Sequence, residues 1–93
     1  MSQKDQKLLG RQIAAARALI GLTQSHLAAE ASISVPTLKR MESSEGAAAG
    51  LTNNVSAVRV ALEKAGVEFI AENGGGAGVR LRKSAFDEPN SAK

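Results

Sequence analysis

The segment from Leu22 to Glu42, LTQSHLAAEASISVPTLKRME, constrains the fold of this 93-residue chain more than any other part. Thr23 is suited to cap a helix that begins at Gln24, because its hydroxyl can accept a hydrogen bond from the first helical turn. Small and apolar residues then recur at helical spacing, namely Leu27, Ala28 and Ala31. The pattern predicts a short helix directly after Leu22.

A second short helix is predicted after a turn. Ser34 can cap it in the same way, and Leu38 and Met41 would form its inward face. Lys39 and Arg40 would point to the opposite side. Two short helices joined by a tight turn, with a basic outer face on the second, form the unit that places a recognition helix in the DNA major groove.

The two halves of this segment resemble the lambda-repressor-like (Cro/Xre) helix-turn-helix family. Its members carry a T-Q-x-x-L-A opening and an [IV]-S-x-x-T-[IL]-x-[RK]-x-E close, and both stand in register here, at 23–28 and 33–42. The chain departs from the family at Ser32, where a turn glycine is usual. Serine adopts a left-handed turn less readily than glycine, so we expect a strained or differently built turn.

A longer helix is predicted before this segment, from about Lys4 to Ile20. The apolar stripe that predicts it consists of Leu9, Ile13, Ala16 and Ile20. Arg17 lies beside that stripe, which is unusual for a guanidinium unless it is paired. The family resemblance implies that Arg17 forms a partly buried ion pair with Glu42; a solvated arginine at the edge of the stripe is the alternative.

After Glu42 the residues become small and polar. Residues 43–50, SSEGAAAG, are expected to form a loop, which serves either as a plain connector or, as in relatives, as a contact to the DNA backbone. A further helix is predicted from about Thr52 to Ala65, capped by Thr52 or Asn53 and ended by Gly66. Its apolar stripe consists of Val55, Val58, Leu62 and Ala65.

The last apolar segments favour strands over helix. Residues 67–71 (VEFIA) are β-branched and aromatic, residues 78–82 (GVRLR) alternate apolar with basic, and residues 72–77 (ENGGGA) favour a turn. The glycine cluster lacks the Lys-Ser/Thr of a phosphate loop and opens no helix, so we predict no nucleotide site there. We therefore predict a β-hairpin.

An isolated hairpin is only marginally stable, so this one must pack on the helices or pair with another chain. Its apolar residues are Val67, Phe69, Val79 and Leu81. We expect its edges to pair across a twofold axis; pairing of protomers through the fourth helix is the alternative. The expected fold is mainly α, a lambda-repressor-like bundle of four to five short helices with a C-terminal β-hairpin. Residues 1–66 would form the DNA-binding domain, 67–83 the dimerisation element and 84–93 a flexible tail.

The net charge of +3 is unevenly placed along the chain. Residues 1–42 hold six Lys/Arg against three Asp/Glu, whereas residues 43–93 hold six of each. The positive excess therefore lies in the half with the helix-turn-helix, as a phosphate-binding surface requires. The absence of cysteine excludes disulfides and cysteine-ligated zinc. With no signal peptide or membrane span in the sequence, we expect a cytoplasmic protein.

No catalytic constellation stands out in the sequence. His26 is the single histidine and has no second imidazole or cysteine to complete a metal or nucleophile site. We expect it to be a solvated helix residue, with a phosphate contact as the alternative. A non-enzyme without cofactor or metal is expected.

The resemblance implies a sequence-specific transcriptional regulator, most simply a repressor, that binds double-stranded DNA as a homodimer. Twofold symmetry would require an inverted-repeat operator with half-site centres ~34 Å apart. The residues expected to contact DNA are Gln24, Ser34, Val35, Thr37, Lys39 and Arg40.

These residues are expected to have different roles. Arg40 can bond guanine O6 and N7 together, and Val35 can contact a thymine methyl. Thr37 and Lys39 are expected to hold phosphate. Gln24 is expected to donate to a phosphate and to brace a recognition-helix side chain.

Two other functions remain open from the sequence. The family includes antitoxins of toxin–antitoxin pairs, which bind both an operator and a protein partner. A protein-interaction module that keeps the helix-turn-helix only as a scaffold is the other alternative. The basic pair Lys39 and Arg40 argues against this second alternative, because a pure scaffold has no need of it.

Overall fold

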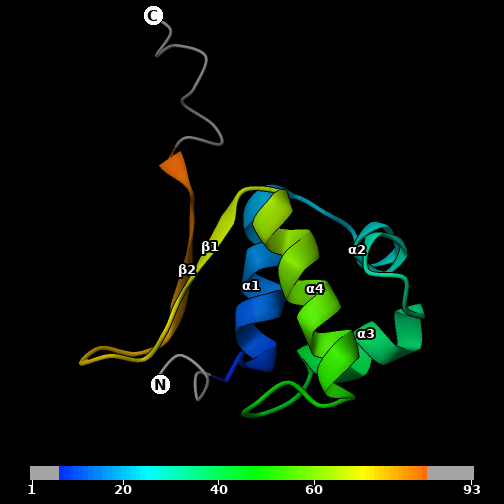
Figure 1. Cartoon of the computed structure of the whole chain (residues 1–93), viewed down its shortest axis with the longest axis horizontal. Helices are drawn as coiled ribbons and strands as arrows, with labels where there is room; N and C mark the ends of the chain where they lie inside the picture. The colour runs from blue at the N-terminus through cyan, green and yellow to red at the C-terminus, as the bar shows by residue number, and fades with distance from the viewer. Residues whose placement is uncertain (1–6, 84–93) are drawn as a thin grey trace, which may run out of the picture.

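The computed structural model describes residues 7–83, which form four helices followed by a two-stranded antiparallel hairpin (Figure 1). The helices are α1 (Gly10–Ile20), α2 (Gln24–Glu30), α3 (Val35–Glu42) and α4 (Thr52–Lys64), and the strands are β1 (Val67–Ile70) and β2 (Gly78–Leu81). The described part is therefore mainly helical with a C-terminal hairpin, as the sequence predicted. The start of the expected first helix at 4–6 and the expected tail at 84–93 lie outside residues 7–83.

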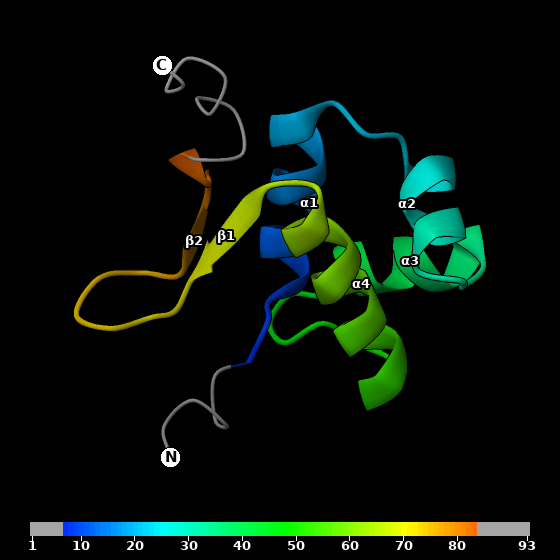
Figure 2. The ribbon, with the colours of Figure 1, turned by 45° about the horizontal axis from the view of Figure 1, so that its top comes forward.

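Helices α1 and α4 lie next to each other at the centre of the molecule, with α2 and α3 on one flank and the hairpin on the other (Figures 1 and 2). Helix α3 contacts both α1 and α2, while β2 lies against α1 and β1 against α4. The hairpin and α3 thus lie at opposite ends of the longest axis of the molecule.

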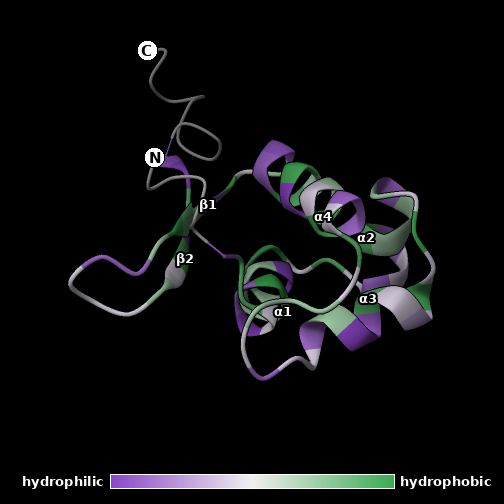
Figure 3. Ribbon diagram, turned by 60° about the horizontal axis from the view of Figure 1, so that its bottom comes forward, coloured by the Kyte–Doolittle hydropathy of each residue, from purple (hydrophilic) through white to green (hydrophobic). Residues whose placement is uncertain are grey.

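One hydrophobic core joins the helices and the hairpin. Its largest fully buried side chains are Ile13, Leu27, Leu38, Met41, Val58, Leu62 and Val67. Each helix is buried on one side only, so hydrophobic (green) and hydrophilic (purple) stretches alternate along the ribbons in Figure 3. Ala65, which we expected to face the core, is exposed instead, because α4 ends one residue earlier.

The first helix begins at Gly10, so the prediction of a start near Lys4 is wrong for residues 7–9. Leu9 forms an isolated antiparallel bridge with Ala47, in the loop at residues 43–50. This pairing between segments almost forty positions apart holds the chain extended ahead of α1. The spacing of apolar residues within one helix gives no information about a partner so distant in the sequence.

Gly10 allows this first turn of α1 to lie directly against the end of α3. A Cβ atom at this position would collide with the backbone carbonyl oxygen of Met41 and would crowd Ser44. The backbone N–H of Gly10 also donates to the carbonyl of Gly46 at 3.0 Å. The close approach explains why a glycine stands at the start of a helix, where its conformational freedom is otherwise a cost.

Gln12 is the buried polar side chain of the core, and it connects α1 to both strands. Its Oε1 accepts a hydrogen bond from the backbone N–H of Leu9 at 2.9 Å. Its Nε2 donates to the carbonyls of Ile70 at 3.2 Å and Gly78 at 2.9 Å. All three bonds need an amide, with one acceptor and two donors. The role of Gln12 was not predicted from the sequence.

Helix α4 has no side-chain cap, so the prediction of Thr52 or Asn53 as its cap is wrong. Leu51 occupies the cap position, and its carbonyl accepts the backbone N–H groups of Asn54 and Val55, both at 3.0 Å. At the other end the helix stops before Gly66, which adopts a left-handed φ of 108°.

The predicted hairpin is confirmed, and it is folded against its own helices. Its register pairs Val67 with Leu81 and Phe69 with Val79. Val67 is fully buried and belongs to the common core, Phe69 and Val79 are half-buried, and Leu81 remains 37 % exposed. The domain boundary expected after Gly66 therefore does not separate two hydrophobic cores.

Within residues 7–83, no helix combines the length and the apolar character needed to cross a membrane.

Candidate nucleic-acid interface

Both caps of the helix-turn-helix are formed as the sequence predicted. The Thr23 hydroxyl accepts the backbone N–H of His26 at 3.0 Å, and the Ser34 hydroxyl accepts that of Thr37 at 3.2 Å. Each cap satisfies a donor that the helix itself leaves without a partner. Helices α2 and α3 thus begin at positions that their own sequences specify.

The turn between the two helices contains Ser32 at a φ of 57°, the one positive value at a residue other than glycine within residues 7–83. A side chain in this left-handed region costs roughly 1–2 kcal/mol. The turn is closed by a hydrogen bond from the backbone N–H of Ile33 to the carbonyl of Ala28 at 2.9 Å. The strain expected from the missing turn glycine is therefore present.

The inner face of α3 is buried against the other helices. Leu38 and Met41 have no exposed surface, and both were predicted to face inward. Val35, at the start of the helix, is half-buried against the same core. The orientation of α3 about its own axis is consequently set by apolar packing.

The end of α3 is held by an ion pair between Glu42 and Arg17 of α1, the pair that the family resemblance implied. The guanidinium Nε lies 2.8 Å from Oε2 of the carboxylate, and a second bond joins Nη2 to Oε1 at 3.1 Å. Nη1 also donates to the carbonyl of Leu22 at 3.0 Å. The side chain of Glu42 is 8 % exposed and that of Arg17 is 24 % exposed, so this two-bond pair is largely shielded from water.

Hydrogen bonding to Glu42 raises the pKa of the Arg17 guanidinium above its ordinary value, and the negative charge of Glu42 adds to the effect, while partial burial opposes it. Because the folded-state pKa is raised, the stabilisation is fully present below the ordinary arginine pKa. It is lost only when the pH rises through the raised value in strongly alkaline solution.

Gln24 braces this ion pair. Its Nε2 donates to Oε1 of Glu42 at 3.0 Å, so the first residue of α2 is tied to the last residue of α3. We expected Gln24 both to brace a recognition-helix side chain and to contact phosphate. The first arrangement is present, and the amide group is directed to Glu42.

The remaining predicted contact residues do not all lie on the outer side of α3. Lys39 and Arg40 lie there and Ser34 caps the helix, but Val35 packs against the core on the inner side. Ser34, Lys39 and Arg40 are exposed, whereas Val35 and Thr37 are half-buried. The hydroxyls of Ser34 and Thr37 bond to each other at 2.8 Å, so both are already engaged at the start of the helix.

Lys39 and Arg40 are adjacent exposed cations of α3. Within residues 7–83, no hydrogen bond or ion pair engages either charged group, whereas Arg17, Arg59 and Arg80 each meet a glutamate. They share the lack of an internal partner within this range with Lys7, Arg11, Lys64 and Lys83. An exposed cation without an internal partner remains available to a phosphate or to a base edge.

Two further residues share this face and were not predicted from the sequence as contact residues. Pro36 and Ser43 are exposed, and together with Arg40 they follow the spacing 36, 40 and 43, which places them on one side of a helix. The periodicity that predicted the buried stripe of α3 could also have identified them. Pro36 offers an apolar ring close to the start of the helix.

His26 lies on the exposed side of α2, with Nε2 at 3.7 Å from the carboxylate of Glu30 one turn later. Both side chains are more than half exposed, so the contact is a surface pair of a helix. Within the described part of the chain, no group of three histidine, cysteine or acidic residues could hold a metal ion.

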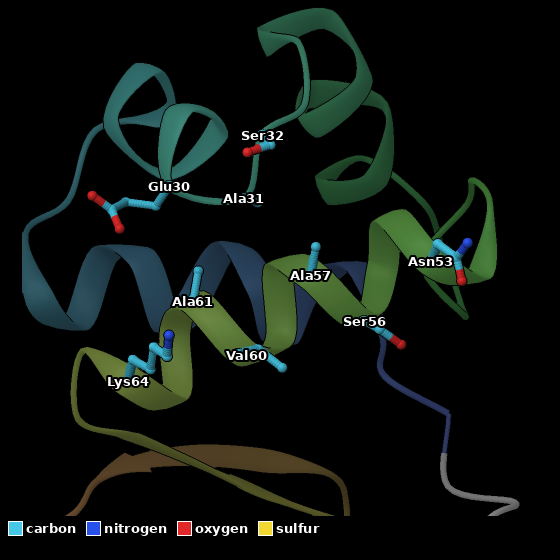
Figure 4. Close-up of a pocket in the computed structure, with 9 residues that line it drawn as sticks. All are labelled: Glu30, Ala31, Ser32, Asn53, Ser56, Ala57, Val60, Ala61 and Lys64. Carbon is cyan, nitrogen blue, oxygen red and sulfur yellow. The ribbon is translucent and has the colours of Figure 1, made fainter.

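A shallow groove runs between α4 and the α2–α3 turn (Figure 4). Small side chains such as Ala57 and Ala61 form much of it, and Glu30 and Lys64 carry charge on its two sides. The groove holds one unpaired cation, Lys64, together with the acidic Glu30, whereas the outer face of α3 carries two adjacent unpaired cations. We therefore place the candidate interface on the outer face of α3.

The chain matches no protein-family model and no curated protein sequence. Its interpretation accordingly depends on the geometry of α2 and α3 and on the side chains that they carry.

Proposed function

We propose that this protein is a sequence-specific transcriptional regulator, most simply a repressor, in which α3 is the recognition helix of a lambda-repressor-like fold. The observation that supports the proposal is the contrast between the two sides of α3. One side is buried and ion-paired, and the other presents Lys39 and Arg40 without internal partners. A rigidly held helix with a free basic face fits the major groove of double-stranded DNA.

Arg40 and Lys39 would serve this function in different ways. Arg40 lies at the centre of the outer face, between Pro36 and Ser43. From this position its side chain would point into the major groove of bound DNA. Its guanidinium can donate to O6 and N7 of one guanine. Lys39 lies at the side of that face, from which an ammonium group can reach the phosphate backbone.

Arg40→Ala is therefore expected to cost about 1–3 kcal/mol of binding to a DNA site selected from random sequence, and to relax the base preference at one position per half-site. Lys39→Ala is expected to weaken binding to selected and scrambled DNA alike, and to reduce the slope of log affinity against log salt by about 1. Fluorescence anisotropy titrations at several salt concentrations measure both effects.

The matched control is Lys64→Ala, which removes an exposed lysine at the groove between α2 and α4. It should leave the affinity and the salt slope nearly unchanged. Equal losses on selected and scrambled DNA for Arg40→Ala would contradict the base-reading role.

We further propose that the regulator acts as a homodimer, paired through the hairpin side of the molecule. Gln12 of α1 bonds the carbonyl of Gly78 at the start of β2. Leu81 lies three residues after Gly78 along β2, and Leu19 lies seven residues after Gln12 along α1. Each spacing corresponds to about 10 Å along its element. Because α1 and β2 run in the same direction (Figure 1), these spacings place the two leucines, 37 % and 44 % exposed, at a similar height on neighbouring elements.

An exposed apolar pair next to an unpaired strand edge is a surface that a second copy can cover symmetrically. Helix α4 offers the competing surface, where Val60 is 47 % exposed at the edge of the groove (Figure 4). Because α3 and the hairpin lie at opposite ends of the long axis, hairpin pairing would separate two α3 helices more widely than α4 pairing.

Leu81→Glu is expected to make the protein mostly monomeric, whereas Val60→Glu should leave the dimer intact. Both side chains are partly exposed already, so neither change places a charge in the core. Sedimentation velocity measures the outcome, and loss of the dimer should weaken binding to a full operator more than to a half-site. A dimer that survives Leu81→Glu and dissociates on Val60→Glu would assign the interface to α4.

A further inference from the structure

The turn of the hairpin carries an Asn-Gly dipeptide, Asn73-Gly74, that projects away from the helices (Figure 1). Both residues are exposed. Gly74 has a left-handed φ of 90°, and no atom lies within 4 Å of the position that a Cβ would occupy there. Solvent can therefore reach the peptide bond between the two residues.

The backbone around this bond leaves one nitrogen free. The N–H of Asn73 donates to the carbonyl of Gly75 at 3.2 Å, which curls the chain tightly around residue 74. The N–H of Gly74 itself has no acceptor within residues 7–83. A nitrogen with no hydrogen bond and no side chain on its own α-carbon can approach the amide of the preceding asparagine.

We propose that Asn73 is a site of spontaneous deamidation through a succinimide. The Gly74 nitrogen gives up its proton to hydroxide and attacks Cγ of Asn73, so that a new C–N bond closes a five-membered ring. The bond between Cγ and the side-chain nitrogen breaks, and ammonia leaves with a proton from water. Water then opens the ring at either carbonyl and produces an aspartate or an isoaspartate. Water is the only co-reactant, and no oxidant or reductant takes part.

Two other asparagines of the described chain lack this geometry. Asn53 and Asn54 lie in the first turn of α4, and each is followed by a residue with a side chain. The nitrogens that would have to attack belong to Asn54 and Val55, and both donate to the carbonyl of Leu51 at 3.0 Å. Helical geometry also holds the asparagine side chains away from the backbone nitrogen that follows. They serve as controls within the same molecule.

Deamidation would add one carboxylate to the hairpin turn and lower the formal net charge from +3 by one. An isoaspartate would also lengthen the backbone of the turn by one methylene group. The change occurs at the end of the hairpin furthest from α3, so the inference is independent of the proposed DNA binding.

The test is a peptide map by mass spectrometry of the full chain, aged at neutral and at mildly alkaline pH. The peptide containing Asn73 is expected to convert steadily to acid forms, faster at the higher pH, and enzymatic methylation specific for isoaspartate should label the same peptide. The peptide containing Asn53 and Asn54 should stay unchanged over the same period. Asn90, outside the described residues, falls in a different peptide and is scored separately.

Two further samples make the result decisive. Asn73→Gln should abolish the conversion, because the longer side chain closes a six-membered ring far more slowly. A synthetic peptide of residues 71–77 gives the rate of the unfolded turn, and the folded protein should react at a comparable rate. An intact Asn73 in the folded protein, under conditions that convert the peptide, would overturn the proposal.

Discussion

Gln12→Glu is expected to destabilise the folded protein by about 3–5 kcal/mol at neutral pH, the cost of a buried charge that keeps one donor, the N–H of Leu9, and faces two carbonyl oxygens. The substitution keeps the size of the side chain but replaces two N–H donors with an oxygen. That oxygen would face the carbonyls of Ile70 and Gly78, which now accept bonds of 3.2 and 2.9 Å. Two carbonyls cannot donate to a carboxylate, so the hairpin would separate from α1. Urea denaturation followed by circular dichroism measures the loss.

The pH dependence of this variant tests the physical cause. Burial beside two carbonyls would raise the folded-state pKa of a glutamate at position 12 above its unfolded value. The variant should therefore be most stable below the unfolded pKa and lose stability as the pH rises through the folded one. Gln12→Met removes the same donors without a charge, so its loss should not depend on pH in this way. Equal pH profiles for the two variants would contradict the explanation.

Arg17→Ala is expected to have the second largest effect, about 2–3 kcal/mol, somewhat below the ~3–5 kcal/mol of a fully buried pair because water reaches part of the guanidinium. It leaves the carboxylate of Glu42, 8 % exposed, with the amide of Gln24 as its remaining partner. Glu42→Ala should cost less, because Arg17 keeps its bond to the carbonyl of Leu22 and can reach solvent. Thermal and urea unfolding of the single variants and the double variant give the coupling energy.

The matched control for this pair is Arg80→Ala, which breaks the ion pair with Glu68 on the outer face of the hairpin. Both of those side chains are well exposed, so the loss should be small and should shrink further in salt. An Arg17→Ala variant as stable as Arg80→Ala would mean that the pair with Glu42 contributes little to stability.

The helix-turn-helix was predictable because its determinants are local. Thr23 and Ser34 cap helices that begin one residue later, and Leu38 and Met41 face inward by simple periodicity. The hairpin was predictable for the same reason, since a turn-forming segment separates two short apolar runs. Each of these features depends on residues a few positions apart.

The features that were not predicted from the sequence depend on partners distant in the chain. The bridge between Leu9 and Ala47 shortens the first helix, and the bonds from Gln12 to the strands span about sixty positions. A glutamine on an amphipathic helix is ordinarily expected to face solvent. Only the position of the hairpin shows that it is enclosed.

The candidate interface was predictable in part. The outward direction of Lys39 and Arg40 followed from the buried stripe, but their lack of internal partners could not be known without the positions of every glutamate. The ion pair of Arg17 with Glu42 was implied by family resemblance alone. Pro36 could have been placed on the outer face by the same periodicity, because it lies four residues before Arg40.

The side chains that hold α3 and the side chains that face outward are two separate sets. Leu38, Met41 and Glu42 hold the helix, whereas positions 36, 39, 40 and 43 make no contribution to the core. Mutations at the outer positions are therefore expected to be nearly neutral for folding while they change the chemistry of the exposed face of the helix. If α3 binds DNA as proposed, a gene duplicate of this protein would acquire a new target within a few substitutions, without passing through an unstable intermediate.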